Sequence, residues 1–347
     1  MSRTRRLLKK LLLSCASLGL AVAAAELICR AQEPGPFSFF DHQPYVDSPA
    51  DLHVRHVPGF TGRWDATWYE IDSRGFRGPE RVPTFAEGEL RIACLGDSTT
   101  FGKGVLEPDT WPRILERELR AEGRNALAFN MGINGAHGRV YRQVLTEHLD
   151  ELKPNLVVVG YNINDFPNSI KAVNEKVFEQ RKLRRVMPQG LRDGLGRLAL
   201  YRKLRAVYYD TQKARDWAAA EATAKGAANE PLDSAVWELQ REYLSGIQAL
   251  AAQHGGRVMV FLFPYESQVY LDSFDTTPIE RLSELCASLD LPFFDVAGEF
   301  RAVARATTPP ARLFLAGDRF HPNAVGYEIV AERVLTRLRE LGWLPAL

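Results

Sequence analysis

The sequence predicts an α/β fold, a parallel sheet of five strands with helices on both faces. Two observations support this prediction. From residue 90 onward, short apolar runs alternate with longer stretches of helical periodicity. The apolar runs are continuous rather than alternating with polar residues, which is typical of strands that are buried on both faces. Because each strand is followed by a helix, we expect successive strands to run parallel and the helices to form the outer layers.

Each strand is read from an apolar run: RIACL, ALAFNMG, NLVVVGY, RVMVFLF and LPFFDV. The first helix is expected from about Thr110, with Pro112 in its first turn and Gly123 just past its end. Further helices are expected over residues 139–152, 235–253, 278–289 and 324–341. Together these elements predict a three-layer α/β/α domain with a five-stranded, flavodoxin-like sheet. Functional sites on such sheets lie at the carboxyl ends of the strands.

The N-terminus carries a different signal. The first ten residues hold five basic side chains, and the next nineteen residues are mostly apolar and carry one charge, Glu26. A basic flank before an apolar run predicts that residues 1–30 are an export signal or a membrane anchor, with the rest of the chain outside the cytoplasm. Residues 23–25 fit a signal cleavage site, which would release a secreted protein. The run is also long enough to span a bilayer, and we favour a single-pass anchor in the cytoplasmic membrane with a periplasmic domain.

Residues 31–89 are rich in proline, glycine and aromatic residues and lack helical periodicity. We expect a small β-rich appendage, in which TWYEIDSRGFRG forms a strand and a turn at Gly75 and Gly78. His53 and His56 form an H-x-x-H pattern without a carboxylate between them, and we expect a surface loop rather than a metal site. The main domain is then expected over residues 90–347.

The alternation of strands and helices is interrupted by an insertion at residues 166–233. Its stretch from Lys171 to Arg215 contains thirteen Lys and Arg residues but only four Asp and Glu residues, and part of it has helical apolar spacing. Three interpretations remain open: a solvated helical insertion, a lid, or a face that lies against anionic lipid headgroups.

Bulk properties exclude some functions. The chain of 347 residues has a formal net charge of +1, so nothing predicts a nucleic-acid partner. Its four cysteines are too few for a disulfide framework in a chain of this length. The seven histidines show no spacing that is typical of a metal site.

Residues 94–104 read CLGDSTTFGKG and follow the first strand. A P-loop requires G-x-x-x-x-G-K-[ST]. Here five residues separate Gly96 from Gly102, and Gly104 stands where the hydroxyl residue should be. We therefore interpret this stretch as a turn that presents Ser98. A serine nucleophile needs a base, a carboxylate that orients the base, and donors for the oxyanion.

Candidates for these groups follow other strands. DRFHPN, in the loop before the last helix, places Asp318 three residues before His321. This spacing allows the carboxylate to orient the imidazole as in a catalytic triad. NMGINGAHG follows the second strand and offers a glycine N–H, and NIND follows the third strand and offers the Asn164 amide. Together the groups form a complete set for acyl transfer.

With these four stretches the sequence resembles the SGNH/GDSL hydrolase family over residues 90–342. The first block of the family, G-D-S, is present at residues 96–98, and the second corresponds to Asn130–Gly135. The third block, G-x-N-D, reads NIND at residues 162–165, so that Asn162 replaces the glycine. The fourth block, D-x-x-H-P, spans Asp318–Pro322. The anchor and the DSRGFRG stretch are also similar to membrane-tethered bacterial members.

The resemblance implies a serine esterase in which Ser98 is the nucleophile, His321 the base and Asp318 its orienting acid. It implies an oxyanion hole formed by the N–H groups of Ser98 and Gly135 and the side chain of Asn164, with Gly132 in a structural role. No metal or organic cofactor is required. The expected substrate is an acyl or acetyl ester of a lipid or carbohydrate. An O-acyltransferase that uses the same residues, and a non-catalytic carbohydrate- or lipid-binding module, are the alternatives.

Overall fold

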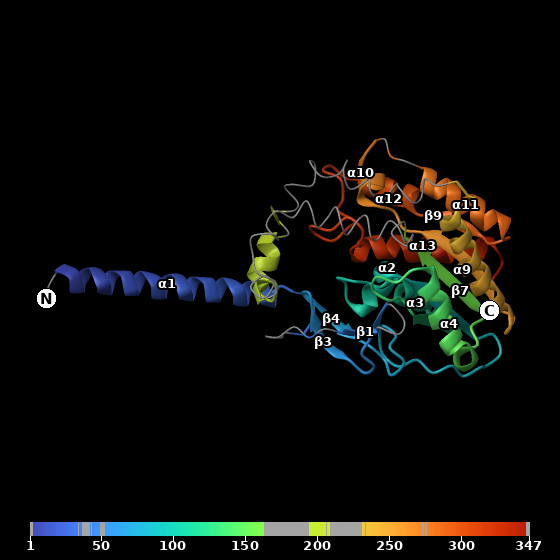
Figure 1. The fold of residues 1–347 in the computed structure, drawn as a ribbon, viewed down its shortest axis with the longest axis horizontal. Coiled ribbons are helices and arrows are strands. Elements are labelled where there is room, and N and C mark those ends of the chain that lie inside the picture. The colour runs from blue at the N-terminus through green and yellow to red at the C-terminus, as the bar shows by residue number, and fades with distance from the viewer. Residues whose placement is uncertain are drawn as a thin grey trace.

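The computed structural model describes residues 3–33, 35–36, 42, 44–48, 53–162, 194–205, 207–208, 231–232, 234–272, 274 and 276–344. Figure 1 shows a layered domain from which one long N-terminal helix projects. The predicted insertion at residues 166–233 lies mostly outside the described residues.

The central sheet has five parallel strands in the order β6-β5-β7-β8-β9. Their bounds are β5 Leu90–Gly96, β6 Ala126–Asn130, β7 Leu156–Tyr161, β8 Arg257–Leu262 and β9 Phe293–Asp295. All five lie where the apolar runs predicted them. Among the strands of this sheet, β5 comes first in the sequence and pairs with the second, β6, and the third, β7. The flavodoxin-like order is therefore confirmed. The reversal at β5 brings the carboxyl ends of β5, β6 and β7 together.

Helices cover both faces of this sheet (Figure 1). On one face, α4 (Gly138–Leu152), α9 (Ala235–Ala252) and α11 (Thr277–Ser288) contribute to one apolar cluster. On the other face, α3 (Trp111–Ala121), α12 (Ala297–Arg305) and α13 (Ala324–Glu340) contribute to a second cluster. The three-layer α/β/α prediction is therefore confirmed.

The strands show why the apolar runs are continuous. In β7, Leu156 and Val158 belong to one cluster, whereas Val157, Val159 and Tyr161 belong to the other. Successive side chains point to opposite faces of a strand, and both faces of this sheet are covered by helices, so an apolar residue is needed at every position. The sheet is a buried platform that fixes the positions of its strand ends.

The N-terminal part contains α1 (Arg3–Ala31) and four short strands. β1 (Tyr45–Ser48) pairs with β2 (His53–His56), and β3 (Thr61–Trp64) pairs with β4 (Thr67–Glu70), each antiparallel. Residues Arg5–Ala31 of α1 are long and apolar enough to cross a membrane, and the most apolar window within them is not buried in the protein.

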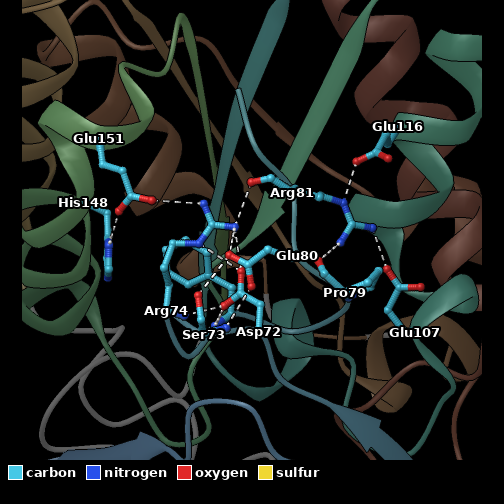
Figure 2. A network of polar contacts seen from close by, with 11 residues as sticks. Asp72, Ser73, Arg74, Pro79, Glu80, Arg81, Glu107, Glu116, His148 and Glu151 are labelled. Carbon is cyan, nitrogen blue, oxygen red and sulfur yellow. Dashed lines mark hydrogen bonds and ion pairs between the residues drawn. The ribbon is translucent and has the colours of Figure 1, made fainter. Parts of the chain in front are cut away.

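Two arginines fasten the turn after β4 to the main domain, as Figure 2 shows. Arg74 donates to Asp72 at 2.7 Å and to Glu151 of α4 at 3.3 Å. Arg81 donates to Glu116 of α3 at 2.9 Å and to Glu107 of the 3₁₀ turn Glu107–Asp109 at 2.7 Å. Glu116 is 2% exposed, so Arg81 neutralises a buried carboxylate. These contacts hold the N-terminal strands on the main domain.

In the part of the chain that the structure describes, three short helices were not predicted: α2 (Ser98–Phe101), α10 (Glu266–Tyr270) and α12. The expectation of a surface loop at His53 and His56 is wrong, because both residues lie in β2. His56 is 5% exposed, its Nδ1 lies 3.0 Å from the carbonyl oxygen of Gly75, and its ring packs on Phe101 of α2. These contacts come from distant parts of the chain, which the local composition could not indicate.

Candidate active site

Ser98 is the first residue of α2, directly beyond the carboxyl end of β5. Asp97 caps this short helix, because its Oδ1 accepts the N–H of Thr99 at 2.8 Å and the Thr99 hydroxyl at 2.6 Å. A side-chain oxygen at this position satisfies an N–H group that has no partner inside the helix. The strand, the cap and the helix make a sharp turn that leaves Ser98 partly exposed.

Asp318 and His321 lie in the loop before α13, and this loop is firmly held. The N–H of Leu315 donates to the carbonyl of His321 at 3.0 Å, and Phe314 forms a bridge with Pro322. Asn323 caps α13 by accepting the N–H of Gly326 at 3.0 Å. The imidazole therefore projects from a rigid loop.

The structure brings Ser98, His321 and Asp318 into one hydrogen-bonded chain. His321 Nε2 lies 2.8 Å from Ser98 Oγ, and His321 Nδ1 lies 2.8 Å from Asp318 Oδ2. An ionised carboxylate can only accept, so Nδ1 carries the proton and Nε2 is left to accept the proton of the serine hydroxyl. This is the arrangement in which an imidazole can act as a general base.

Asp318 is held in its ionised form. Burial by itself raises the pKa of Asp318, but the charge of His321, the hydrogen bonds from His321 and the Phe320 N–H, and the charge of Lys103 all lower it. The lowering effects are the larger, and the pKa of Asp318 lies well below its usual range. Its Oδ1 accepts the Phe320 N–H at 2.8 Å while Oδ2 faces the imidazole. The carboxylate thus has both oxygens engaged and a fixed orientation.

The loop after β6 runs beside α2. A Cβ on Gly132 would lie 2.3 Å from the backbone nitrogen of Phe101 and 2.8 Å from the carbonyl carbon of Thr100, so only glycine allows this approach. Gly135 has a φ of +74° and open space where a Cβ would be. Within the described part of the chain, neither Ser98 nor Gly135 donates its N–H to another group. Both N–H groups are therefore available to a ligand.

A buried arginine that sequence reasoning missed packs against the turn that carries Ser98. Arg77 is 2% exposed, and its guanidinium lies 4.1 Å from the ring centroid of Tyr69 and 5.0 Å from that of Phe101. Its Nη2 donates to the carbonyl of Val105 at 2.9 Å, just beyond α2. Burial lowers the pKa of Arg77 to about 10. The two glycines of DSRGFRG predicted a turn here, but nothing local indicated that its second arginine would support α2.

The N-terminal strands also reach the site. The hydroxyl of Tyr69 accepts the N–H of Gly104 at 2.9 Å, and the Lys103 ammonium lies 5.6 Å from the ring centroid of Trp64. Lys103 also donates its backbone N–H to the carbonyl of Ser98 at 3.0 Å. Lys103 thus belongs to the turn that presents Ser98.

Asn164, the remaining predicted site residue, lies outside the described residues. Asn162 is described and is 1% exposed at the end of β7. Among the described residues, no group of three or more His, Cys, Asp or Glu side chains could hold a metal ion.

Comparison with models of protein families gives a match that covers most of the chain. Residues 94–329 match the model of the GDSL-like lipase/acylhydrolase family. No curated protein matches the sequence.

Several solved structures are similar in fold. TesA is 16% identical with a TM-score of 0.43, and the match covers 72% of this chain and 98% of that one. An esterase, EstA from Pseudoalteromonas sp., is 12% identical with a TM-score of 0.42 and coverages of 74% and 98%. The acetyl xylan esterase AlAXEase is 14% identical with a TM-score of 0.40 and coverages of 71% and 99%.

Proposed function

The chain belongs to the GDSL-like lipase/acylhydrolase family and is an ester-bond hydrolase, and from this we propose that it cleaves acyl or acetyl esters through Ser98. The observation that carries the proposal is the chain of two 2.8 Å hydrogen bonds from Ser98 through His321 to Asp318. A serine hydroxyl is a weak nucleophile and requires such a base.

The proposed reaction has two steps. His321 Nε2 takes the proton of Ser98 as Oγ attacks the ester carbonyl, and the same imidazole then protonates the leaving alcohol. In the second step, His321 takes a proton from water as this water attacks the acyl-enzyme, and the imidazolium then gives the proton to Ser98 Oγ as the acid is released. Asp318 stays ionised and stabilises the imidazolium in both steps.

We propose that the N–H groups of Ser98 and Gly135 and the side-chain amide of Asn164 stabilise the oxyanion. The two backbone donors are supported by their lack of other acceptors among the described residues. The role of Asn164 rests on the family motif, since this residue lies outside the described part. Donors that are fixed before the reaction stabilise the developing charge without reorganisation.

For the placement of the enzyme, we propose that residues 1–30 are a retained anchor in the cytoplasmic membrane. Residues 31–89 then form an appendage, and residues 90–347 form a hydrolase domain on the periplasmic side. The length and exposure of α1 support this arrangement, and secretion after signal cleavage is the alternative. The substrate class is an ester of a lipid or carbohydrate.

The test is a series of p-nitrophenyl esters of increasing chain length, assayed with the full chain in detergent, with and without sugar acceptors. We expect hydrolysis of at least one ester, and a loss on the order of 10⁶-fold in kcat for Ser98→Ala. Ser73→Ala, at an exposed serine of the turn after β4, is the matched control and should retain activity. Equal activity of Ser98→Ala and wild type would refute the proposal. Faster acyl transfer to a sugar than to water would instead identify an acyltransferase.

A further inference from the structure

An acidic residue interrupts the apolar surface of α1 at its outer end, and the structure shows what it binds. Glu26 Oε1 accepts the N–H of Ala199 at 2.9 Å, and Oε2 accepts the N–H of Leu200 at 2.9 Å. Residues 199–205 are helical, so this carboxylate satisfies N–H groups at the start of a helix. Arg30 completes the contact by donating to Glu26 at 2.8 Å and to the carbonyl of Arg197 at 2.6 Å.

A second contact lies just beyond α1. Glu33 accepts from Arg202 at 3.0 Å and from Arg63 of β3 at 3.1 Å. The side chains of all three residues are at most 9% exposed. Buried charges are costly unless they are paired. The contacts of Glu26 and Glu33, which we call the joint, therefore favour one arrangement of α1, the N-terminal strands and residues 194–208. In Figure 1 the helix of this segment lies across the end of α1.

The position of Glu26 along α1 determines how far from the centre of a bilayer its binding partners lie. The apolar run covers residues 11–29, and at 1.5 Å per residue its length is about 28 Å, close to the roughly 30 Å hydrocarbon core. Glu26 therefore lies near the outer boundary of that core. Residues 197, 199 and 200, which bind Glu26 and Arg30, must lie at about the same level.

The described residues 194–205, 207 and 208, which we call the 194–208 segment, have an exposed surface that suits this level. Leu204, Val207 and Tyr208 are 62%, 58% and 51% exposed. Residues 194–208 contain four basic residues and no acidic one. Apolar and tyrosine side chains next to cations are typical of helices that lie in a membrane interface.

We propose that the 194–208 segment lies on the outer surface of the membrane that α1 spans. Leu204, Val207 and Tyr208 enter the interfacial region, and Lys203 and Arg205 face anionic headgroups. The inference rests on the proposed retained anchor but not on the proposed catalytic residues. Its consequence is that the hydrolase domain is held at the membrane surface by two contacts instead of swinging on a single helix.

The test uses the full chain in vesicles of phosphatidylcholine and phosphatidylglycerol, with one environment-sensitive fluorophore on a cysteine. Leu204→Cys and Val207→Cys are the test sites, Leu20→Cys reports on α1, and Val82→Cys, at an apolar residue that is 71% exposed, is the matched control. Cys15 and Cys29 are replaced by alanine. Cys94 and Cys286 are buried, and burial raises the pKa of both thiols, that of Cys286 to about 12, so neither competes for the label.

For fluorophores at positions 204 and 207 we expect a blue-shifted emission and quenching by lipids that carry a nitroxide at shallow depth. A fluorophore at position 82 should show neither effect. Glu26→Ala should weaken quenching at position 204 while position 20 remains quenched. Glu299→Ala, which removes another surface carboxylate, should leave the quenching at positions 204 and 20 unchanged. If positions 204 and 207 behave like position 82 while position 20 is quenched, the inference is wrong and the anchor stands. If position 20 is also unquenched, the proposed anchor and the proposed membrane contact of the 194–208 segment are both wrong. Ester hydrolysis is measured on the same samples, so that a failure of the catalytic proposal is recognised separately.

Discussion

Replacement of Gly132 by alanine should inactivate the enzyme by displacing Ser98, the proposed nucleophile, although we assign Gly132 itself no part in the chemistry. The new Cβ would lie 2.3 Å from the backbone nitrogen of Phe101, whereas ordinary contacts begin at 3.4 Å. Either α2 or the loop after β6 must therefore move by about 1 Å, and a misplacement of this size can cost on the order of 10²-fold in rate. The overlap should also cost about 1–3 kcal/mol of stability.

Gly123→Ala, just past the end of α3, is the matched control, because its Cβ would meet nothing within 4 Å and Gly123 has no proposed role in the site. Its positive φ should cost about 1–2 kcal/mol of stability, with kcat close to that of the wild type. The assay is kcat on the best p-nitrophenyl ester, with urea unfolding of both variants to confirm that the folded protein is being measured. A folded Gly132→Ala enzyme with wild-type kcat, or a larger loss of kcat in Gly123→Ala, would show that this packing does not position Ser98.

Three further predictions concern stability and the other site residues. Burial lowers the pKa of His56 to about 4 from 6.5, so the unfolded state binds the extra proton between these values and stability falls as pH drops from 6.5 to 4. The loss should reach about 3 kcal/mol, and urea unfolding of His56→Gln over this range should show a correspondingly smaller loss than wild type. Asp318→Asn should lower kcat by about 10⁴-fold with a small change in Tm, because the imidazole would lose the acceptor that fixes its tautomer; a kcat within tenfold of wild type would contradict this role. Asn164→Ala should lower kcat by roughly 10²–10³-fold with little change in KM, whereas Asn162→Ala, at a buried site, should mainly lower Tm; the reverse pattern would assign the oxyanion role to the wrong residue.

The sequence was sufficient for the sheet because burial on both faces leaves a strong local signal. Every residue of β7 is buried, so its apolar run is continuous and can be read without knowledge of its partners. The longer helices were also predictable, because α3 begins with Pro112 in its first turn and ends just before Gly123. Short helices such as α2, of four residues, are too brief to show periodicity.

The chemical groups of the candidate site could be predicted from the sequence, but the buried residues that pack beneath them could not. Ser98, Asp318 and His321 stand in local patterns at expected strand and helix ends, so their roles could be proposed from spacing. Arg77 and His56 acquire their environments from Tyr69, Phe101 and Gly75, and these contacts form only in the folded chain. A charged or titratable residue in a loop-like sequence gives no local sign that it will be buried beneath the turn that carries Ser98.

The same reasoning applies to Glu26. In the sequence it is a single charge near the end of an apolar run, compatible with an anchor or with a cleaved signal. Its partners, the N–H groups of Ala199 and Leu200, are more than 170 residues away. Only the folded structure shows that this charge has a binding partner, and our proposal that the 194–208 segment faces the membrane depends on that contact.

The central claim is that Ser98 is the nucleophile, and covalent labelling tests it most directly. A fluorophosphonate probe reacts with a serine that is activated by a base, and mass spectrometry of the digested protein identifies the modified residue. We expect a single adduct on the peptide that contains Ser98, with labelling and ester hydrolysis lost together, and no adduct in Ser98→Ala. An adduct on another residue, or an active enzyme that forms no adduct at Ser98, would contradict the account.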